Sequence, residues 1–366
     1  MKKTVFLILT GIIFMFTAVA GAAELKVPDW IKEVDLNGFA SVGYNYDFNE
    51  PHSRNINFRP FNNRDNTFGL ELAQLVFHKD AAAPGSTGFN LDLNYGYTVP
   101  AAIHSTGQSS SGDFDVKQAF ISYVAPIGSG LKLDAGKFIT EFGAEVIEGY
   151  AGWNYNYSRS LLFYYTIPYT HTGLRGTYVF NDRLTLIGCV ANGWDNVTDN
   201  NGGKSVFIHA AMTPAANTTL NVKYIVGPEQ NDNNNNLRHV LNLNFGITVL
   251  EKLVFSADYV YGSEKNVPGI GDSDWTGIAG VFRYPVSDKL AMSLRAEFFN
   301  DSDGARTGTM QDMWEFTFTP EYAINGNMLV RAEYRHDQSD KNVFDGKDAG
   351  DKKHQDTLGM NLIYHF

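Results

Sequence analysis

The chain has 366 residues and carries 40 acidic against 29 basic side chains, for a formal net charge of -11 at pH 7. This acidic balance argues against nucleic acid as a partner, because the phosphate backbone would be repelled. The one cysteine, Cys189, excludes an intrachain disulfide framework.

The first 23 residues have the organisation of a secretory signal peptide. Lys2 and Lys3 precede an apolar run over residues 5–19, and small residues follow up to Ala23. A single transmembrane anchor is the alternative, but the run is short and ends in small residues. No cysteine lies in this stretch, so a lipoprotein anchor is not expected. We therefore predict that residues 1–23 are removed and that residues 24–366 form one exported domain, with a net charge of -13 instead of -11 once the two lysines are lost.

Apolar and polar residues alternate with a period of two along most of the remaining chain, which predicts strands. The predicted strands cover residues 35–47, 66–78, 87–98, 113–125, 130–139, 171–180, 183–194, 204–213, 218–227, 237–249, 252–262, 274–285, 288–299, 312–323, 328–338 and 355–366. About sixteen strands is an even number, as bacterial single-chain outer-membrane barrels require.

The predicted connections alternate in length. Short ones cover residues 79–86, 126–129, 181–182, 214–217, 250–251, 286–287 and 324–327. Long polar ones lie between them and include residues 48–65, 228–236, 263–273, 300–311 and 339–354. Short turns at one end and long loops at the other are typical of up-and-down outer-membrane barrels. The predicted fold class is all-β, a transmembrane antiparallel barrel of about sixteen strands.

Each predicted strand has one apolar row and one row that carries charges. Leu294 and Phe298, for example, alternate with Arg295 and Glu297. Lysine or arginine on a lipid-facing row near the bilayer midplane would cost roughly 2–4 kcal/mol each, so the charged rows are expected to face inward. Aromatic residues at the strand ends indicate the two interfacial girdles of a membrane barrel.

The chain ends on Tyr364, His365 and Phe366. A terminal strand leaves an open edge unless it pairs with the first strand and closes a barrel. This ending resembles the closing strand of bacterial outer-membrane barrels, which implies that Phe366, with Tyr364, serves as the assembly signal. Side chains no longer fill a barrel of this size, so we expect a water-filled channel. A lumen closed by a ladder of salt bridges is the alternative, and it suits barrels of about eight strands.

The predicted connection over residues 140–170 is long and rich in aromatic residues. Such a loop should not extend into water, so we expect it to fold back into the lumen and narrow the pore. An external loop packed against its neighbours or another protomer is the alternative. Charged residues of this loop and of the inward rows are the predicted pore constriction: Glu141, Glu145, Glu148, Arg159, Arg175, Arg295, Arg331 and Arg335.

Several short motifs between about Gly136 and Asp199 carry a family resemblance. They are Gly136-Lys137-Phe138, Glu141-Phe142-Gly143, Asn156-Tyr157-Ser158-Arg159-Ser160, Pro168, His171-Thr172-Gly173-Leu174-Arg175 and Asn192-Gly193-Trp194-Asp195. Together they resemble the OmpL-like putative β-barrel porin family; elsewhere the match rests on strand pattern and chain length. The resemblance implies an outer-membrane barrel with channel function, and it supplies no catalytic residues.

Enzymatic and metal-binding alternatives have weaker support. None of the nine histidines lies in a nucleophile elbow or a zincin motif. Ser158 and His171 are a candidate Ser/His pair, but a local hydrogen bond for Ser158 and a place at a strand start for His171 are the simpler interpretation. The Asp- and Asn-rich stretches 230–236 and 345–351 offer oxygen ligands for Ca²⁺ without EF-hand spacing. We predict no catalytic residue, no metal site and no cofactor.

The function expected from these observations is passive diffusion of small hydrophilic solutes through a porin of the Gram-negative outer membrane, with a weak preference for cations. An outer-membrane barrel hydrolase and a structural or adhesive barrel with a blocked lumen are the alternatives. The expected partners are outer-membrane lipid with lipopolysaccharide and the barrel assembly machinery, with a homotrimer as a candidate assembly. Nucleic acid is not an expected partner.

Overall fold

The computed structural model describes residues 33–100, 112–250, 252–348 and 350–366. Nearly all of these residues belong to one unit, Leu36–Phe366. The predicted signal peptide, residues 1–23, lies outside the described residues. No helix of the described residues is long and apolar enough to cross a membrane.

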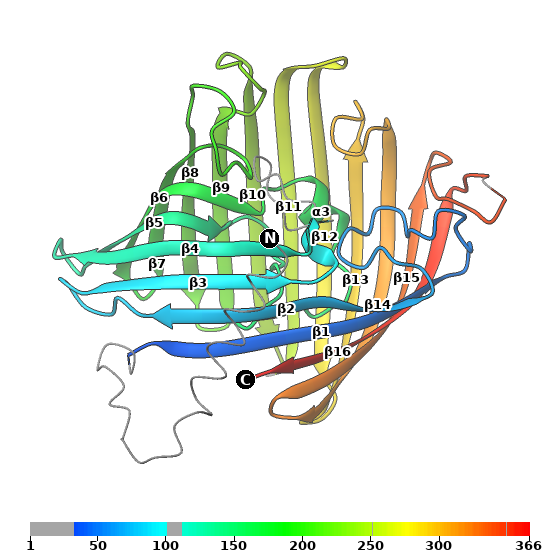
Figure 1. The fold of residues 1–366 in the computed structure, drawn as a ribbon, viewed down its shortest axis with the longest axis horizontal. Coiled ribbons are helices and arrows are strands. Elements are labelled where there is room, and N and C mark those ends of the chain that lie inside the picture. Colours follow the sequence, from blue (N-terminus) through cyan, green and yellow to red (C-terminus); the bar gives the residue numbers. More distant parts are fainter. Residues whose placement is uncertain (1–32, 101–111, 251, 349) are drawn as a thin grey trace, which may run out of the picture. The chain divides into compact units, whose positions relative to one another are not determined.

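The described residues include sixteen strands and the short helix α3. Their bounds are β1 Asp35–Asp47, β2 Thr67–Lys79, β3 Thr87–Tyr95, β4 Phe114–Ala125, β5 Leu131–Ile139, α3 Leu161–Tyr165, β6 Thr170–Asn181, β7 Leu184–Ala191, β8 Ser205–Ala215, β9 Thr218–Pro228, β10 Leu237–Val249, β11 Leu253–Val267, β12 Gly271–Pro285, β13 Leu290–Asp301, β14 Gln311–Asn325, β15 Met328–Ser339 and β16 His354–His365. Each strand lies beside its neighbours in sequence, and β1 pairs with β16 in an antiparallel register that closes the barrel (Figure 1). The predicted fold class is confirmed.

The structure differs from the prediction at one loop and at the ends of two strands. The predicted long loop over residues 263–273 is wrong, because β11 and β12 continue as a hairpin and pair as far as Val267 with Gly271. Their ends are polar on both faces, so the alternation that marks a membrane strand stops before the backbone pairing does. β3 and β7 are shorter than predicted and end at Tyr95 and Ala191.

The two rows of each strand differ in burial as the alternation predicts. Along β13, Leu294 and Phe298 are 40% and 43% exposed, whereas Arg295 and Glu297 are 1% and 4% exposed. We call the row that contains Arg295 and Glu297, together with the residues that pair with them around the barrel, the inner row. The exposed apolar row is the surface that a lipid bilayer would cover.

Single cysteines test this assignment in a Cys189→Ala background. Cysteines in place of Thr219 and Ser256, which lie in the inner row and line a cavity, should react with a membrane-impermeant, water-soluble thiol reagent. Cysteines in place of Leu294 and Phe298 should stay unmodified, because lipid covers them. Equal modification of both pairs in intact outer membranes would contradict the assignment of the rows.

The seam between β1 and β16 involves the last residue directly. The Phe366 amide donates to the Gly38 carbonyl, and the Gly38 amide donates to the Phe366 carbonyl, both at 3.0 Å. A Cβ atom on Gly38 would overlap the Phe366 ring, so the glycine allows the ring to lie flat against the first strand. Phe366 therefore extends the seam with both its backbone and its side chain.

Replacing or deleting this aromatic residue should impair assembly. We expect Phe366→Ala to lower the amount of folded barrel in the outer membrane without changing export, because the packing of the ring on Gly38 is lost while the two backbone hydrogen bonds remain. Heat-modifiable migration of the membrane fraction on gels measures the folded amount. Wild-type abundance of the folded Phe366→Ala barrel would show that the seam does not depend on this residue.

Candidate functional site

The candidate site is the segment that joins β5 to β6, residues 140–169. It contains α3, whose N-terminal residues Leu161, Leu162 and Phe163 are buried. Ser160 caps this helix, because its Oγ accepts a hydrogen bond from the Phe163 amide at 3.0 Å. The Glu297 carboxylate of β13 accepts from the first two helical amides, at 2.6 and 3.2 Å, and so satisfies groups that a short helix leaves unpaired.

Three arginines of the inner row hold the backbone of this segment. Their NH1 atoms donate to carbonyl oxygens at 2.6 Å from Arg295 to Ser158, 2.7 Å from Arg331 to Asn154 and 2.6 Å from Arg335 to Arg159. Glu333 accepts in return from the backbone amides of Tyr157 and Ser158, at 2.7 and 2.9 Å. Charged hydrogen bonds of this kind are roughly twice as strong as neutral ones, so the path of residues 154–159 is firmly held.

The acidic residues of the segment form ion pairs with the predicted arginines. The pairs are Glu141 with Arg175 at 2.7 Å, Glu145 with Arg295 at 2.9 Å, and Glu148 with Arg331 at 2.9 Å and with Arg159 at 3.1 Å. Arg335 instead pairs with Asp337 at 2.6 Å and lies 3.5 Å from Glu315. The structure thus brings seven of the eight predicted residues into direct pairs, while Arg335 finds its carboxylates on the strands.

Further contacts join the segment to strands on other sides of the barrel. The Gly143 amide donates to Asn242 of β10 at 2.8 Å, and the Ala144 amide donates to Asp258 of β11 at 3.0 Å. Inner-row side chains on other strands also bind the segment. Lys223 of β9 donates to the Gly143 carbonyl, and Lys117 of β4 donates to the Ile147 carbonyl. Gln74 of β2 accepts from the Tyr150 amide, and Thr319 of β14 accepts from the Asn156 side chain. The alternation identifies such residues as inward-facing, but it does not identify them as partners of this segment.

Tyr157 connects the segment to the β1–β16 seam. Its hydroxyl group donates to Glu71 of β2 and accepts from Asn45 of β1 at 2.9 Å. A Cβ atom on Gly43 of β1 would overlap this hydroxyl group, and one on Gly359 of β16 would lie 2.8 Å from the ring. Two glycines on paired strands therefore make room for one tyrosine.

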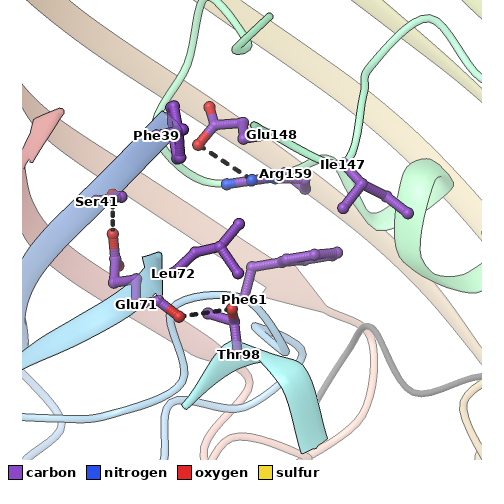
Figure 2. Close-up of a pocket in the computed structure, with 9 residues that line it drawn as sticks. All are labelled: Phe39, Ser41, Phe61, Glu71, Leu72, Thr98, Ile147, Glu148 and Arg159. Carbon is purple, nitrogen blue, oxygen red and sulfur yellow. Dashed lines mark hydrogen bonds and ion pairs between the residues drawn. The ribbon is translucent and has the colours of Figure 1, made fainter. Parts of the chain in front are cut away.

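A cavity of about 10 Å³, the size of one water molecule, lies where the segment meets β1 and β2. Figure 2 shows Glu148 and Arg159 facing each other on one side of it, and Glu71 reaching Ser41 on the other. The interface between the segment and these strands is thus closely packed.

Apolar side chains add a buried cluster to these polar contacts. The segment contributes Phe142, Leu161, Leu162, Phe163, Ile167 and Tyr169, and the strands contribute residues such as Phe207, Val240, Val260, Trp275, Phe299 and Met313. Phe61 and Phe344 join from two other connections. A membrane barrel that buries such a cluster away from lipid resembles a soluble protein in this part of its interior.

Two larger cavities lie beside β9–β12 and the neighbouring connections. One of about 350 Å³ lies between residues 144–146 and 153–156 of the segment and an uncharged wall formed by Thr219, Gly246, Val254, Ser256 and Val281. Another of about 560 Å³ is lined by residues of the long connections, among them Trp194, Asn200 and Arg306. The wall of β13–β16, in contrast, supplies Arg295, Arg331 and Arg335, together with Glu297 and Glu333, to the backbone of the segment.

The candidate Ser/His pair is not brought together as a nucleophile and base. Ser158 Oγ accepts from Arg295 and Arg335, each at 3.2 Å, and His171 Nε2 lies 3.1 Å from Thr140 Oγ1. The described residues contain no group of three or more His, Cys, Asp or Glu side chains that could hold a metal ion. The two Asp- and Asn-rich stretches are engaged in loop hydrogen bonds such as Asn234 with the Gly202 amide and Asp345 with the Ser53 amide, both at 2.8 Å.

The pairing of Glu148 makes the docking of the segment sensitive to acid. Burial raises the pKa of Glu148, but the positive charges of Arg159 and Arg331 lower it by more than burial raises it. The pKa therefore lies below the ordinary value of 4.5. Its contribution to docking is therefore complete above pH 4.5 and is lost as the pH falls through the lowered pKa. We expect single-channel conductance to rise only in that acidic range, and Glu148→Gln at pH 7 to resemble the acidified wild type. A change in single-channel conductance between pH 5 and pH 7 that the Glu148→Gln variant also shows would contradict this assignment.

The comparisons with known proteins fit this geometry. The sequence profile described as "Putative beta-barrel porin-2, OmpL-like" matches residues 33–366. The chain belongs to this family. The family assignment made from the motifs between Gly136 and Asp199 is confirmed. No curated protein matches the chain.

Solved outer-membrane proteins share the fold. OmpT of Vibrio cholerae in its trimer form is 14% identical, with a TM-score of 0.60 over 91% of this chain and 99% of that one. The outer-membrane channel DcaP of Acinetobacter baumannii is 12% identical, with a TM-score of 0.60 over 91% and 97%. An anion-selective porin from Comamonas acidovorans is 11% identical, with a TM-score of 0.61 over 91% and 99%. At these identities the likeness concerns the fold alone, and this fold is that of outer-membrane porins.

Proposed function

We propose that this member of the OmpL-like porin family is a passive diffusion pore of the bacterial outer membrane for small hydrophilic solutes. Residues 1–23 direct its export, and no chemical step takes place in it. The observation that carries the proposal is the closed sixteen-strand barrel in which one connection, residues 140–169, binds the inner row of strands on several sides. A segment with these contacts lies in the lumen and narrows the pore.

The arginine contacts favour a passage on one side of that segment. Arg295, Arg331 and Arg335 are fully buried and hold the backbone of residues 154–159, so they anchor the constriction. The cavity of about 350 Å³ against β9–β12 is the space left for solutes at the level of the segment. The passage then runs along β8–β12 toward the cavity near Trp194.

Ion selectivity follows from the pairing of charges. Because Glu141, Glu145 and Glu148 are each paired with arginine, they give the constriction little net charge. The acidic chain as a whole favours cations at the mouth, and salt screens this effect within about 8 Å at physiological ionic strength. The pore is therefore weakly cation-preferring, and the preference fades as salt increases.

Purified protein in a planar bilayer tests the function directly. We expect single-channel conductance steps and a reversal potential on the cation side in a KCl gradient, smaller at 1 M than at 0.1 M salt. A reversal potential on the anion side would overturn the cation preference. The absence of conductance at neutral and acidic pH would overturn the pore.

A blocked barrel with a structural or adhesive role is the second candidate. The apolar cluster around α3 favours it, because those side chains fill part of the interior with a packed core. The same bilayer recording separates the two candidates, since a blocked barrel gives no conductance steps.

The partners follow from the proposed location. Outer-membrane lipid and lipopolysaccharide would cover the exposed apolar row, and the barrel assembly machinery would recognise the closing strand that ends in Tyr364 and Phe366. A homotrimer is the proposed assembly, supported by the trimer form of the similar Vibrio cholerae protein.

A further inference from the structure

We propose that three aromatic side chains of the constricting segment, Tyr150, Trp153 and Tyr155, form a stacking site for neutral sugar rings. This inference rests on the proposed pore function and names a class of solute for it. Aromatic side chains stack favourably on flat, weakly polar faces, and the CH-rich face of a pyranose ring is such a surface.

The tip of the segment presents these aromatic residues to open space. Tyr150 and Tyr155 are 37% and 38% exposed, although neighbouring Tyr157 is 1% exposed. Trp153 lines two cavities, the one of about 350 Å³ and another of about 480 Å³ shared with Tyr150 and His365. Trp153 therefore belongs to the lining of both cavities, where a solute in either one can meet it.

The tip is rigid enough to act as a preformed site. Gly149 and Gly152 exchange two backbone hydrogen bonds of 3.1 Å, which closes a tight turn around Tyr150. The Asn154 side chain bonds both the amide and the carbonyl group of Val146, at 2.8 and 2.9 Å. The Trp153 ring packs on His365 of β16 at a centroid distance of 4.9 Å. Rings held in this way lose little conformational freedom when a solute binds.

The charges around the site favour a neutral solute. Glu145 is the one charged residue that lines the cavity of about 350 Å³, and its carboxylate is engaged by Arg295 at 2.9 Å and by the Ser160 amide at 2.8 Å. The Arg283 guanidinium lies 4.8 Å from the Tyr155 ring centre, which disfavours a second cation there. Arg283 is itself paired with Glu321 at 2.7 Å, so this pair adds little net charge to attract an anion.

The opposite wall of the cavity supplies hydroxyl groups rather than ions. Thr219 and Ser256 lie there with Gly246, which has no side chain that would project into the cavity. Hydroxyl groups facing an aromatic platform suit a solute that has an apolar face and hydroxyl groups along its edge. A sugar ring has this chemistry, whereas an open-chain polyol has the hydroxyl groups without the flat face.

Current recordings with paired solutes test the proposal. Glucose and maltose, added to the purified protein in a planar bilayer, should block the ion current in a saturable manner, and sorbitol at the same concentration should block it much less. Trp153→Ala should raise the half-blocking sugar concentration about tenfold, a change of about 1.4 kcal/mol that matches one aromatic stack. Tyr155→Ala should raise it in the same direction, and Trp153→Phe should retain most of the block.

Trp314→Ala is the matched control, because this tryptophan lies on the exposed row of β14 and is 43% exposed. Its half-blocking sugar concentration should equal that of the wild type. Equal block by glucose and sorbitol, or an unchanged half-blocking concentration in folded Trp153→Ala, overturns the sugar site and leaves the pore function standing. If the wild type gives no conductance, the pore function fails, and the site is then decided by sugar-dependent tryptophan fluorescence in detergent, which must differ between the wild type and Trp153→Phe.

Discussion

Replacing residues 144–164 by a short glycine–serine linker is expected to raise single-channel conductance severalfold. The removed residues include all of α3 except Tyr165, and the carbonyl groups that Arg295, Arg331 and Arg335 bind, so the barrel would lose its constriction while β5 and β6 keep their pairing. Side chains alone do not fill a sixteen-strand barrel, and water would enter the vacated space. Planar-bilayer recordings at neutral pH measure the change.

Shortening a different connection is the control for this deletion. Removing residues 268–270 at the tip of the β11–β12 hairpin should leave conductance close to the wild-type value, because all three residues are exposed and the Ile270 amide bonds the Val267 carbonyl within the same turn. If the 144–164 deletion folds, as shown by heat-modifiable migration, and its conductance equals that of the wild type, the segment does not narrow the pore.

Arg335→Met is expected to destabilise the barrel by about 3–5 kcal/mol, because it removes the cation from a buried network. Its guanidinium group is fully buried, pairs with Asp337 at 2.6 Å and lies 3.5 Å from Glu315. Without it, Asp337 keeps only Arg59, at 2.8 Å, and Glu315 keeps only Arg295, at 2.7 Å, so the buried network is left with excess negative charge. Urea unfolding of the protein in lipid vesicles, followed by tryptophan fluorescence, measures the free energy of unfolding.

Two further variants show whether the loss comes from the buried charges. Lys347→Met removes the cation of an exposed pair with Glu50 at 2.7 Å and should have no measurable effect, because water screens that pair. The double variant Arg335→Met with Glu315→Gln should recover part of the lost stability, since the excess negative charge of the network is reduced by one. A free energy for Arg335→Met that equals the value for Lys347→Met would contradict the network.

The strands were predictable because alternation reports directly on the two environments of a membrane strand. The bounds of β1 and β10 agree with the prediction at both ends. The hairpin between β11 and β12 was missed because residues 263–273 are polar, and a backbone ladder above the bilayer needs no apolar row. Periodicity describes what surrounds a strand, so it fails where both faces meet water.

The candidate site was predictable by residue type but not by partner. Arg295, Arg331 and Arg335 follow from the inner row, and the acidic residues follow from the composition of the long connection. Which carboxylate meets which arginine depends on the path of residues 140–169 through space. Arg335 shows the limit, because Asp337, two positions along the same strand, is its nearest carboxylate. The glycines opposite Tyr157 had no recognisable role until their neighbour was known.

Tyr157 also bears on the order in which the chain assembles. The other strands pair with sequence neighbours, but the seam must join β1 to β16 across nearly the whole chain, which is the slowest kind of contact to form. Tyr157 touches both strands, since it bonds Asn45 on β1 and lies against Gly359 on β16. Once docked on β1, Tyr157 offers β16 a surface that fits it. Only the correct register of β16 places a glycine, Gly359, beneath the ring.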